Sequence, residues 1–564
     1  MKNQLMQIRR KVALIIAVTM LIGAISFAQT RHSEVLWLDF DMKNIPEPTE
    51  RESGAYDYFF KGQLIEGAKR RVDVPRWLRL ATGHLKQASN VNALDEVPDS
   101  SWYTNRHHIR HMDTAALQRG PNIGNPPDFT SAVITKAKTS GVSPGMMVND
   151  ATGQAYLIKF DDFNYPNLQS GAEVISTKIL YAAGYNVPEN YVAYINPKDV
   201  KIGNKVEIRD PKTGKQRPLT QDDLDEMLWR VARLPDGRCR VLASKILKGK
   251  PKGPFSQMGF RSDDPNDLIP HEDRRELRAL RVIASWINDW DLKEVQSLDM
   301  YVEENGRKFL RHYLLDFGSS LGADADPTDY YHGREYGFDV HSVTKEIFSF
   351  GLYGSANEKR ARIISPEIGN FTTDDFDPGD WKPTYPSIMF DNLTDIDAFW
   401  AARVILSFTK EELRNIIQTA EYSDPMANEY MLRTLWERRQ IVAHHWLGKT
   451  DALSDFSVRP LGQGVALTFH DLIVEHALAL IDFTEYTYQV KGKNYKSSKM
   501  TVSSREITID RETLGAATEH GLTDTPVEVS IWTHRRDFTS EPVKVYFNWS
   551  PDRQQLTIRR IDRS

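Results

Sequence analysis

Residues 283–322 constrain this chain most, because they carry two separated acidic sites that the local pattern brings to one place. Apolar residues at helical spacing end at Ile287, and an acidic loop from Asp289 to Asp291 follows. Asn305-Gly306 then predicts the tip of a β-hairpin, whose returning strand leads into Asp316. We therefore expect two carboxylate sites at one end of a sheet, an arrangement that metal-assisted phosphoryl transfer requires.

Length and charge limit the kinds of protein this chain can be. With 564 residues it is too long for a single hydrophobic core, so we expect about two to four domains. Apolar residues at 40% and charged residues at 26% are ordinary globular values. The net charge of -5 lacks the excess of basic residues that is typical of nucleic-acid-binding proteins, so we set nucleic acid aside as a partner.

The N-terminus differs from everything after it. Basic residues at 9–11 precede an apolar run at 12–27, and Ser26 and Ala28 are small residues at the positions that a signal peptidase reads. We predict a cleavable export signal over residues 1–28 and a periplasmic or extracellular body. The alternative is an uncleaved N-terminal anchor, although the run is shorter than the roughly 20 residues of a membrane span.

Reactive side chains outside the acidic stretch give weak signals. Cys239 is the single cysteine, so an intramolecular disulfide is excluded. We predict a small buried hydrophobe there; the alternative, a nucleophile, lacks a neighbouring Cys-His pattern. His107, His108 and His111 are close in sequence, but no carboxylate or thiol stands at ligand spacing, so the sequence does not favour a metal there.

The pattern along the chain predicts several regions after the export signal. An N-terminal extension, interrupted by prolines and anchored by Trp102 and Tyr103, is expected to wrap over the main domain. A Gly/Pro run at 248–255 indicates a connector between a strand-rich and a helical lobe. Helical patterns occur at 271–288, 395–419 and 425–447, and alternating strands, typical of a sandwich, follow. The predicted regions are an extension at 29–130, lobes at 131–255 and 256–450, and a small β domain at 454–564.

Lys159 is the only charge in an otherwise apolar predicted strand at 155–160. Period-2 alternation places it on the face opposite Tyr156, Ile158 and Phe160. A helix predicted from Gly171 to Tyr185 carries Glu173 in its first turn, close enough to face this lysine. A turn with Gly141 and Gly145 separates the two strands that precede Lys159.

These pieces occur in a definite order: a glycine hairpin, a strand lysine, a helix glutamate, a connector, an acidic loop and Asp316-Phe317-Gly318. In this order, residues from about 131 to 450 resemble the protein-kinase-like fold, and in particular the atypical kinases of the HipA and CotH type. Asp291-Leu-Lys-Glu-Val-Gln296 stands where those families have Asp-x-(His/Lys/Arg)-x-x-Asn. The resemblance implies an α+β fold with a strand-rich N-lobe and a helical C-lobe.

The resemblance also implies a nucleotide site. Lys159 would hold the α and β phosphates of ATP, and Glu173 would pair with Lys159. Gly141 and Gly145 would cover the phosphates, although their loop lacks the Gly-x-Gly-x-x-Gly spacing.

Catalytic and metal-binding roles follow in the same way. Asp291 would orient or deprotonate a hydroxyl of a protein or small-molecule acceptor, and Lys293 would neutralise charge on the transferred phosphoryl group. Asp316 and Gln296 would bind Mg²⁺ or Mn²⁺. Gln296 replaces the family's Asn and is one methylene longer. Asp289 and Asp299 are possible substitutes for the base or the metal ligand.

Two functions remain open at this point. The first is an exported, ATP-using kinase-like phosphotransferase. The second is a catalytically inactive pseudokinase, in which Lys159 and Glu173 form a structural ion pair, Asp316 caps a turn, and the β tail binds a protein or carbohydrate partner. Export favours the second, since ATP is scarce outside the cytoplasm; the joint presence of Lys159, Glu173, Asp291 and Asp316 favours the first.

Overall fold

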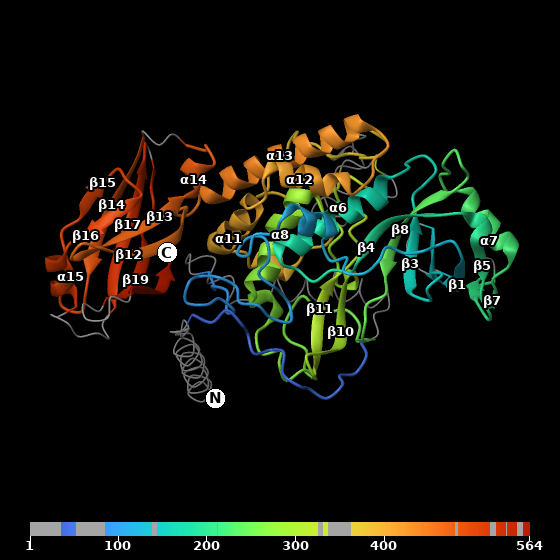
Figure 1. The fold of residues 1–564 in the computed structure, drawn as a ribbon, viewed down its shortest axis with the longest axis horizontal. Coiled ribbons are helices and arrows are strands. Elements are labelled where there is room, and N and C mark those ends of the chain that lie inside the picture. Colours follow the sequence, from blue (N-terminus) through green and yellow to red (C-terminus); the bar gives the residue numbers. More distant parts are fainter. Residues whose placement is uncertain are drawn as a thin grey trace, which may run out of the picture.

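The computed structural model describes residues 35–51, 85–137, 144–210, 213–324, 327, 331–336, 363–479, 483–518, 526–536, 538–549 and 556–563. The predicted export signal at 1–28 lies outside this described part. Figure 1 shows a strand-rich lobe at one end, a helical lobe in the middle and a second β region at the other end. No helix in the described ranges has the length and apolarity needed to span a membrane.

A mixed six-stranded sheet forms the N-lobe, with strand order β4-β8-β3-β2-β1-β5. Its β1–β5 pair is parallel and its other pairs are antiparallel. The strands are β1 (Ala132–Ala137), β2 (Gly145–Asn149), β3 (Ala155–Phe160), β4 (Asn190–Ile195), β5 (Val200–Ile202) and β8 (Cys239–Lys245). A hairpin of β6 (Glu207–Arg209) and β7 (Gln216–Pro218) and the helix α7 (Gln221–Trp229) adjoin the sheet. Cys239 is buried at the start of β8, so its interpretation as a small core residue is confirmed.

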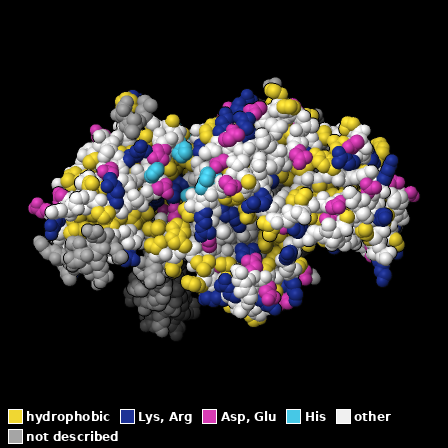
Figure 2. Space-filling model, in the orientation of Figure 1, with side chains coloured by type: hydrophobic (Ala, Val, Ile, Leu, Met, Phe, Trp, Pro, Cys, Tyr) yellow, Lys and Arg dark blue, Asp and Glu magenta, His cyan; other side chains and the backbone are white. Residues whose placement is uncertain are grey.

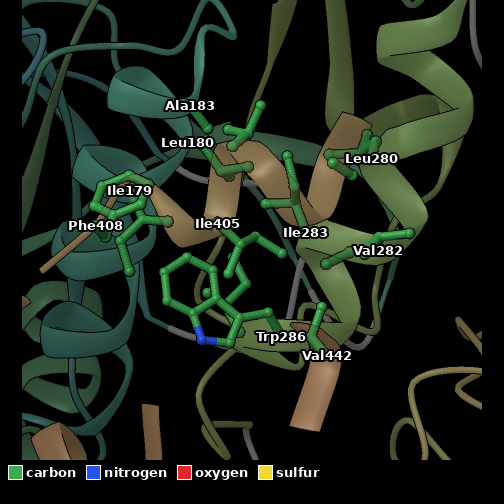
Figure 3. Close-up of a cluster of buried hydrophobic side chains, with 14 of the residues drawn as sticks. Ile179, Leu180, Ala183, Leu280, Val282, Ile283, Trp286, Ile405, Phe408 and Val442 are labelled. Carbon is green, nitrogen blue, oxygen red and sulfur yellow. The ribbon is translucent and has the colours of Figure 1, made fainter. Parts of the chain in front are cut away.

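Helix α6 (Leu168–Ala183) contacts β4 and β8, yet most of its buried apolar side chains belong to the core of the other lobe. Figure 3 shows Ile179, Leu180 and Ala183 beside side chains of the C-lobe helices, among them Ile283 and Trp286. The N-lobe sheet has a separate core of its own. Glu173 therefore lies on a helix that packs against both lobes, whereas Lys159 belongs to the sheet.

The C-lobe combines helices with a small sheet. The hairpin at Asn305-Gly306 is confirmed, and its first strand also pairs with β9 in the connector. The predicted helix at 395–419 is in fact two helices, because Thr409 caps a new helix with Glu412 in a capping box. The C-lobe elements are β9 (Lys250–Pro251), η3 (His271–Asp273), α8 (Arg275–Ile287), η4 (Glu294–Gln296), β10 (Ser297–Glu304), β11 (Arg307–Leu314), α10 (Ile388–Asp391), α11 (Asp395–Leu406), α12 (Lys410–Gln418) and α13 (Pro425–Leu447). Helix α5 (Thr114–Arg119) of the N-terminal extension contacts α12.

The C-terminal region is a β-sandwich. One sheet has the order β12-β13-β16, the other β15-β14-β17-β19-β20 with β18 beside β17, and side chains of both sheets share one core. Two short helices accompany the sheets. The elements are β12 (Leu453–Leu461), β13 (Gly464–Asp471), α14 (Leu472–Glu475), β14 (Thr484–Lys491), β15 (Met500–Val502), β16 (Glu506–Ile509), α15 (Arg511–Ala517), β17 (Val527–Arg535), β18 (Phe538–Thr539), β19 (Val543–Trp549) and β20 (Leu556–Asp562).

The N-terminal extension runs along both lobes, as expected. The Ile45 amide donates to Lys308 O in the hairpin, and the Arg51 amide donates to Lys252 O in the connector. Tyr103 forms a bridge with Tyr185 after α6. Trp102 and Tyr103 are both buried, so their role as anchors is confirmed. On the face in Figure 2, basic and acidic side chains are interspersed.

Candidate active site

Lys159 lies on the face of β3 that the alternating pattern predicts. Tyr156, Ile158 and Phe160 are buried in the sheet core, so Lys159 projects from the opposite face. Its Nζ is 3.1 Å from Glu173 Oε2 and 2.6 Å from Asp316 Oδ1. Burial opposes the charge on Lys159, but the two carboxylates outweigh burial and raise the pKa of the ammonium.

Glu173 is buried and receives further donors. Because α6 begins at Leu168, Glu173 lies in the second turn of the helix and not in its first. Asn190 Nδ2 donates to Glu173 Oε1 over 3.4 Å, and the Phe317 backbone also donates to this carboxylate. Burial raises the pKa of Glu173, while Lys159 opposes that shift. With three donors facing the carboxylate, we describe the contact with Lys159 as an ion pair.

Asp316 follows β11 in the left-handed region, with φ at 62°, and its side chain is half-exposed. Phe317 after it is fully buried in the C-lobe core. A Cβ on Gly318 would lie 3.3 Å from Glu173 Oε2, so a side chain there would crowd the ion pair. The Asp-Phe-Gly segment is thus fixed on one side by the core and on the other by Glu173.

The acidic loop begins where Asn288 ends α8 in a left-handed conformation. Asp289 is buried, and its Oδ2 has no hydrogen-bond partner among the described residues. Burial raises the pKa of Asp289 well above its usual range, and the negative charges of Asp291, Asp316 and Glu173 raise it further. Four carboxylates therefore face one region of the molecule.

Asp291 is held by three donors. Its Oδ1 is 2.5 Å from Lys293 Nζ and accepts from Thr384 Oγ1 over 3.2 Å, and its Oδ2 accepts from Gln296 Nε2 over 2.6 Å. Burial raises the pKa of Asp291 against the opposing effect of Lys293. Gln296 Oε1 accepts from the Lys293 amide over 2.9 Å, so both ends of the Gln296 amide are engaged within the loop.

The remaining candidate residues are Gly145, Gly141 and Asp299. Gly145 is the strand partner of Lys159 across the β2–β3 pair, whereas Gly141 is outside the described residues. Asp299 is buried and bound to His312 and Arg261 at 2.6 and 2.8 Å. Burial acts to raise the pKa of Asp299, but the contacts with His312 and Arg261 outweigh it and lower the pKa. Asp299 is therefore a structural residue and not a substitute base.

Sequence reasoning missed two polar contributors. Asn190 opens β4, where its amide contacts Glu173 and Thr177. Thr384 belongs to an irregular stretch that has no recognisable motif, yet its hydroxyl donates to Asp291. A cavity of about 370 Å³ lies beside the acidic loop and is lined partly by Asn288, but neither Lys159 nor Asp316 lines it.

The histidines in the extension do meet a carboxylate, which the sequence did not reveal. Ligand atoms of His107, His111 and Glu412 lie within 4.8 Å of one another. However, His107 Nδ1 accepts from the Met112 amide, so its proton is on Nε2, which faces Ser407 O at 3.0 Å. Both ring nitrogens are satisfied, and burial lowers the pKa of His107, so this cluster is a polar contact between the extension and α12.

Comparisons with known proteins give distant structural likenesses. No protein-family model matches the sequence, and neither does any curated protein sequence. The crystal structure of a Helicobacter pylori proinflammatory kinase, CtkA, is 12% identical with a TM-score of 0.30, over 57% of this chain and 99% of that chain. The Golgi casein kinase is 10% identical with a TM-score of 0.29, over 74% and 96%. The structure of the Golgi casein kinase with Mn/ADP bound is also 10% identical, with a TM-score of 0.29, over 72% of this chain and 95% of that chain.

The fold assignment rests on the elements themselves. A strand lysine, a helix glutamate and an Asp-Phe-Gly aspartate meet between a strand-rich lobe and a helical lobe. The chain accordingly has an α+β, two-lobed, protein-kinase-like fold, extended by an N-terminal segment and a C-terminal β region.

Proposed function

We propose that this protein is an exported kinase-like phosphotransferase that moves the γ-phosphoryl group of ATP to a hydroxyl of a protein or small molecule. The observation that carries the proposal is the position of Lys159 Nζ, 3.1 Å from Glu173 and 2.6 Å from Asp316. An ammonium held between a fixed carboxylate and a half-exposed one is positioned to bind phosphate oxygens while Glu173 keeps its place. We assign Lys159 to the α and β phosphates.

The carboxylates fit a divalent cation, since Asp289 has a buried oxygen without a partner in the described part of the chain and Asp316 is half-exposed. Carboxylate oxygens are the ligands that Mg²⁺ and Mn²⁺ prefer. A bound cation would neutralise charge on the β and γ phosphates. We assign Asp316 to this cation.

Asp291 is the proposed base. Burial raises its pKa, which improves its match to a hydroxyl proton near neutral pH. In the proposed step the acceptor oxygen bonds to the γ-phosphorus, the bond to the β-phosphate oxygen breaks, ADP leaves, and the acceptor proton passes to Asp291. Lys293, 2.5 Å from Asp291, balances negative charge beside the transferred group.

A thermal-shift titration tests nucleotide binding. ATP with Mg²⁺ or Mn²⁺ is expected to stabilise the protein by about 2.7 kcal/mol at a hundredfold excess over Kd. Asp316→Ala should abolish most of this stabilisation. Asp455→Ala is the matched control, because Asp455 also has a positive φ and its side chain is 60% exposed, compared with 54% for Asp316. If neither ATP mixture stabilises the wild type, the enzyme proposal fails.

Turnover separates catalysis from binding. Asp291→Asn should keep the nucleotide-dependent stabilisation but reduce ADP formation by about 100-fold or more. If ADP forms at the wild-type rate, Asp291 is not the base.

The donors on Asp291 also support a second candidate, a non-catalytic nucleotide-binding scaffold. Lys293, Gln296 and Thr384 occupy both carboxylate oxygens, which leaves Asp291 engaged within its own loop. In that case the C-terminal sandwich would supply the partner-binding surface for a protein or glycan. Nucleotide-dependent stabilisation without ADP formation by the wild type would support this function.

Export is supported by the sequence at residues 1–28, with its basic flank, apolar run and small residues. The proposed mature protein begins near Gln29. N-terminal sequencing of the exported protein tests this part, and an intact Met1 would contradict cleavage.

A further inference from the structure

Asp289 is the one member of the acidic group whose environment the proposed roles leave unexplained. Its side chain is 1% exposed, and Oδ2 has no hydrogen-bond partner within the described ranges. The backbone is fixed, because the Asp289 amide donates to Ala284 O over 2.9 Å and Asn288 ends α8. Burial of a polar oxygen without a hydrogen-bond partner is unfavourable. A ligand that binds this oxygen would therefore stabilise the loop.

The formal charges around Asp289 are unbalanced. Four carboxylates, those of Glu173, Asp289, Asp291 and Asp316, act on one another across this region. Two ammonium groups, Lys159 and Lys293, oppose them. The carboxyl groups outnumber the ammonium groups by 4 minus 2, or 2, and a divalent cation bound there would supply positive charge for the two in excess.

Gln296 is poorly available as a ligand for such a cation. Its Oε1 accepts from the Lys293 amide and its Nε2 donates to Asp291. Turning Oε1 towards a cation would therefore disturb both hydrogen bonds. Asp289 loses no hydrogen bond through its Oδ2 on coordination, and an ionised carboxylate is a stronger ligand for a hard cation than a neutral amide.

We propose that Asp289, together with Asp316, forms the divalent-cation site of this chain, in the place that the resemblance assigns to Gln296. The inference rests on the proposed function for the identity of the cation as Mg²⁺ or Mn²⁺. The site belongs to the protein itself and binds the cation without nucleotide.

The test is a Mn²⁺ titration of the full-length, nucleotide-free protein, with free Mn²⁺ measured by electron paramagnetic resonance. The wild type is expected to bind one Mn²⁺ at this site. Asp289→Asn and Asp316→Asn should each raise Kd at least tenfold, and Gln296→Ala should change it less than twofold. Asp451→Asn is the matched control, because it makes the same change at a buried carboxylate that contacts the C-terminal sandwich and should leave Kd unchanged.

A melting curve distinguishes a ligand from a structural residue. Without cation, Asp289→Asn should melt at or above the wild-type temperature, since it replaces a buried carboxyl group whose Oδ2 has no partner in the described ranges, and it should lose the Mn²⁺-induced rise. A lower melting temperature with an unchanged Mn²⁺-induced rise would overturn the inference. So would a wild type that binds no Mn²⁺, or a Gln296→Ala variant that loses binding tenfold while Asp289→Asn does not.

Failure of this inference can be told apart from failure of the proposed function. If ATP with Mn²⁺ stabilises both the wild type and Asp289→Asn equally, the cation site is overturned and nucleotide binding stands. If Mn²⁺ binding depends on Asp289 but ATP has no effect, the cation site is supported and the phosphotransferase proposal fails.

Discussion

The ion pairs of Lys159 show how strongly the energy of a contact depends on the burial of the partner. Glu173 is buried and Asp316 is half-exposed, so the two contacts of the same ammonium differ in energy. The contact with Asp316 is screened by water and contributes little to folding. The contact with Glu173 neutralises a carboxylate that would otherwise be buried without a cation.

A double-mutant comparison measures this difference. Lys159→Met should lower the free energy of unfolding by about 3 kcal/mol, because it leaves Glu173 charged and buried. Adding Glu173→Gln should restore most of that loss, since both charges are then removed. Urea unfolding of the two variants and the wild type gives the values.

The control is an exposed pair in the sandwich. Arg459 is 2.6 Å from Glu506, but both side chains are about half-exposed, so Arg459→Met should cost less than about 1 kcal/mol. Equal losses in Lys159→Met and the double variant would contradict the assignment of the buried pair.

At the scale of elements, an aromatic cluster connects the extension to both the connector and the hairpin. Trp102 stacks on His312 at 3.5 Å and meets the edge of Phe255 at 5.0 Å. The Arg274 guanidinium lies 4.9 Å from the Trp102 ring. Asp299 in β10 holds His312 in place, so one side chain of the extension stabilises elements around the junction of the lobes.

Trp102→Ala should destabilise the two lobes by about 3–5 kcal/mol, because it leaves a cavity in this cluster. Trp229→Ala, at a residue of α7 that is 83% exposed, is the matched control and should have little effect. Thermal unfolding of the two variants beside the wild type provides the measurement. An unchanged melting temperature for Trp102→Ala would show that the extension does not stabilise the lobes.

At the scale of the whole molecule, the C-terminal strand returns to the N-terminal extension. The Ile561 amide donates to Ala93 O, and Arg563 contacts Asp95 and the backbone oxygens of Asp451 and Leu453. Burial at this junction lowers the pKa of Arg563 to about 10. The sandwich is therefore attached to the rest of the protein through both of its ends.

Asp451 at this junction gives a pH-dependent prediction. Burial raises its pKa to about 6, although Ser540 and Thr533 donate to it. A raised pKa in the folded state stabilises the protein at pH below about 4, and this contribution is lost as pH rises through 6. The full loss is about 3 kcal/mol.

Asp451→Asn lacks this loss, so its stability relative to the wild type should rise between pH 4 and pH 7. Urea unfolding across that pH range measures the difference. Asp455→Asn, an exposed change four residues further along the chain in β12, controls for the removed negative charge. Parallel stability curves for Asp451→Asn and the wild type would show that Asp451 does not titrate in this range.

The sequence by itself determined the local features that depend on short-range contacts. Asn305-Gly306 fixed the hairpin, and alternation in β3 fixed the face that carries Lys159. It did not reveal that α6 starts at Leu168, because no side-chain cap marks that end of the helix. Nor did it reveal that Thr409 divides the predicted helix at 395–419, because the apolar pattern continues across the capping box.

Only the tertiary structure decided which polar groups meet and which stay unpaired. Lys159 and Asp316 are 157 positions apart, and His107 meets Glu412 from a distant helix. The hydrogen bonds of Gln296 and the unpaired oxygen of Asp289 likewise follow from how the loop packs between α8 and its neighbours. Residue types and spacings specify local geometry, whereas burial and pairing depend on contacts between segments that the sequence does not order in space.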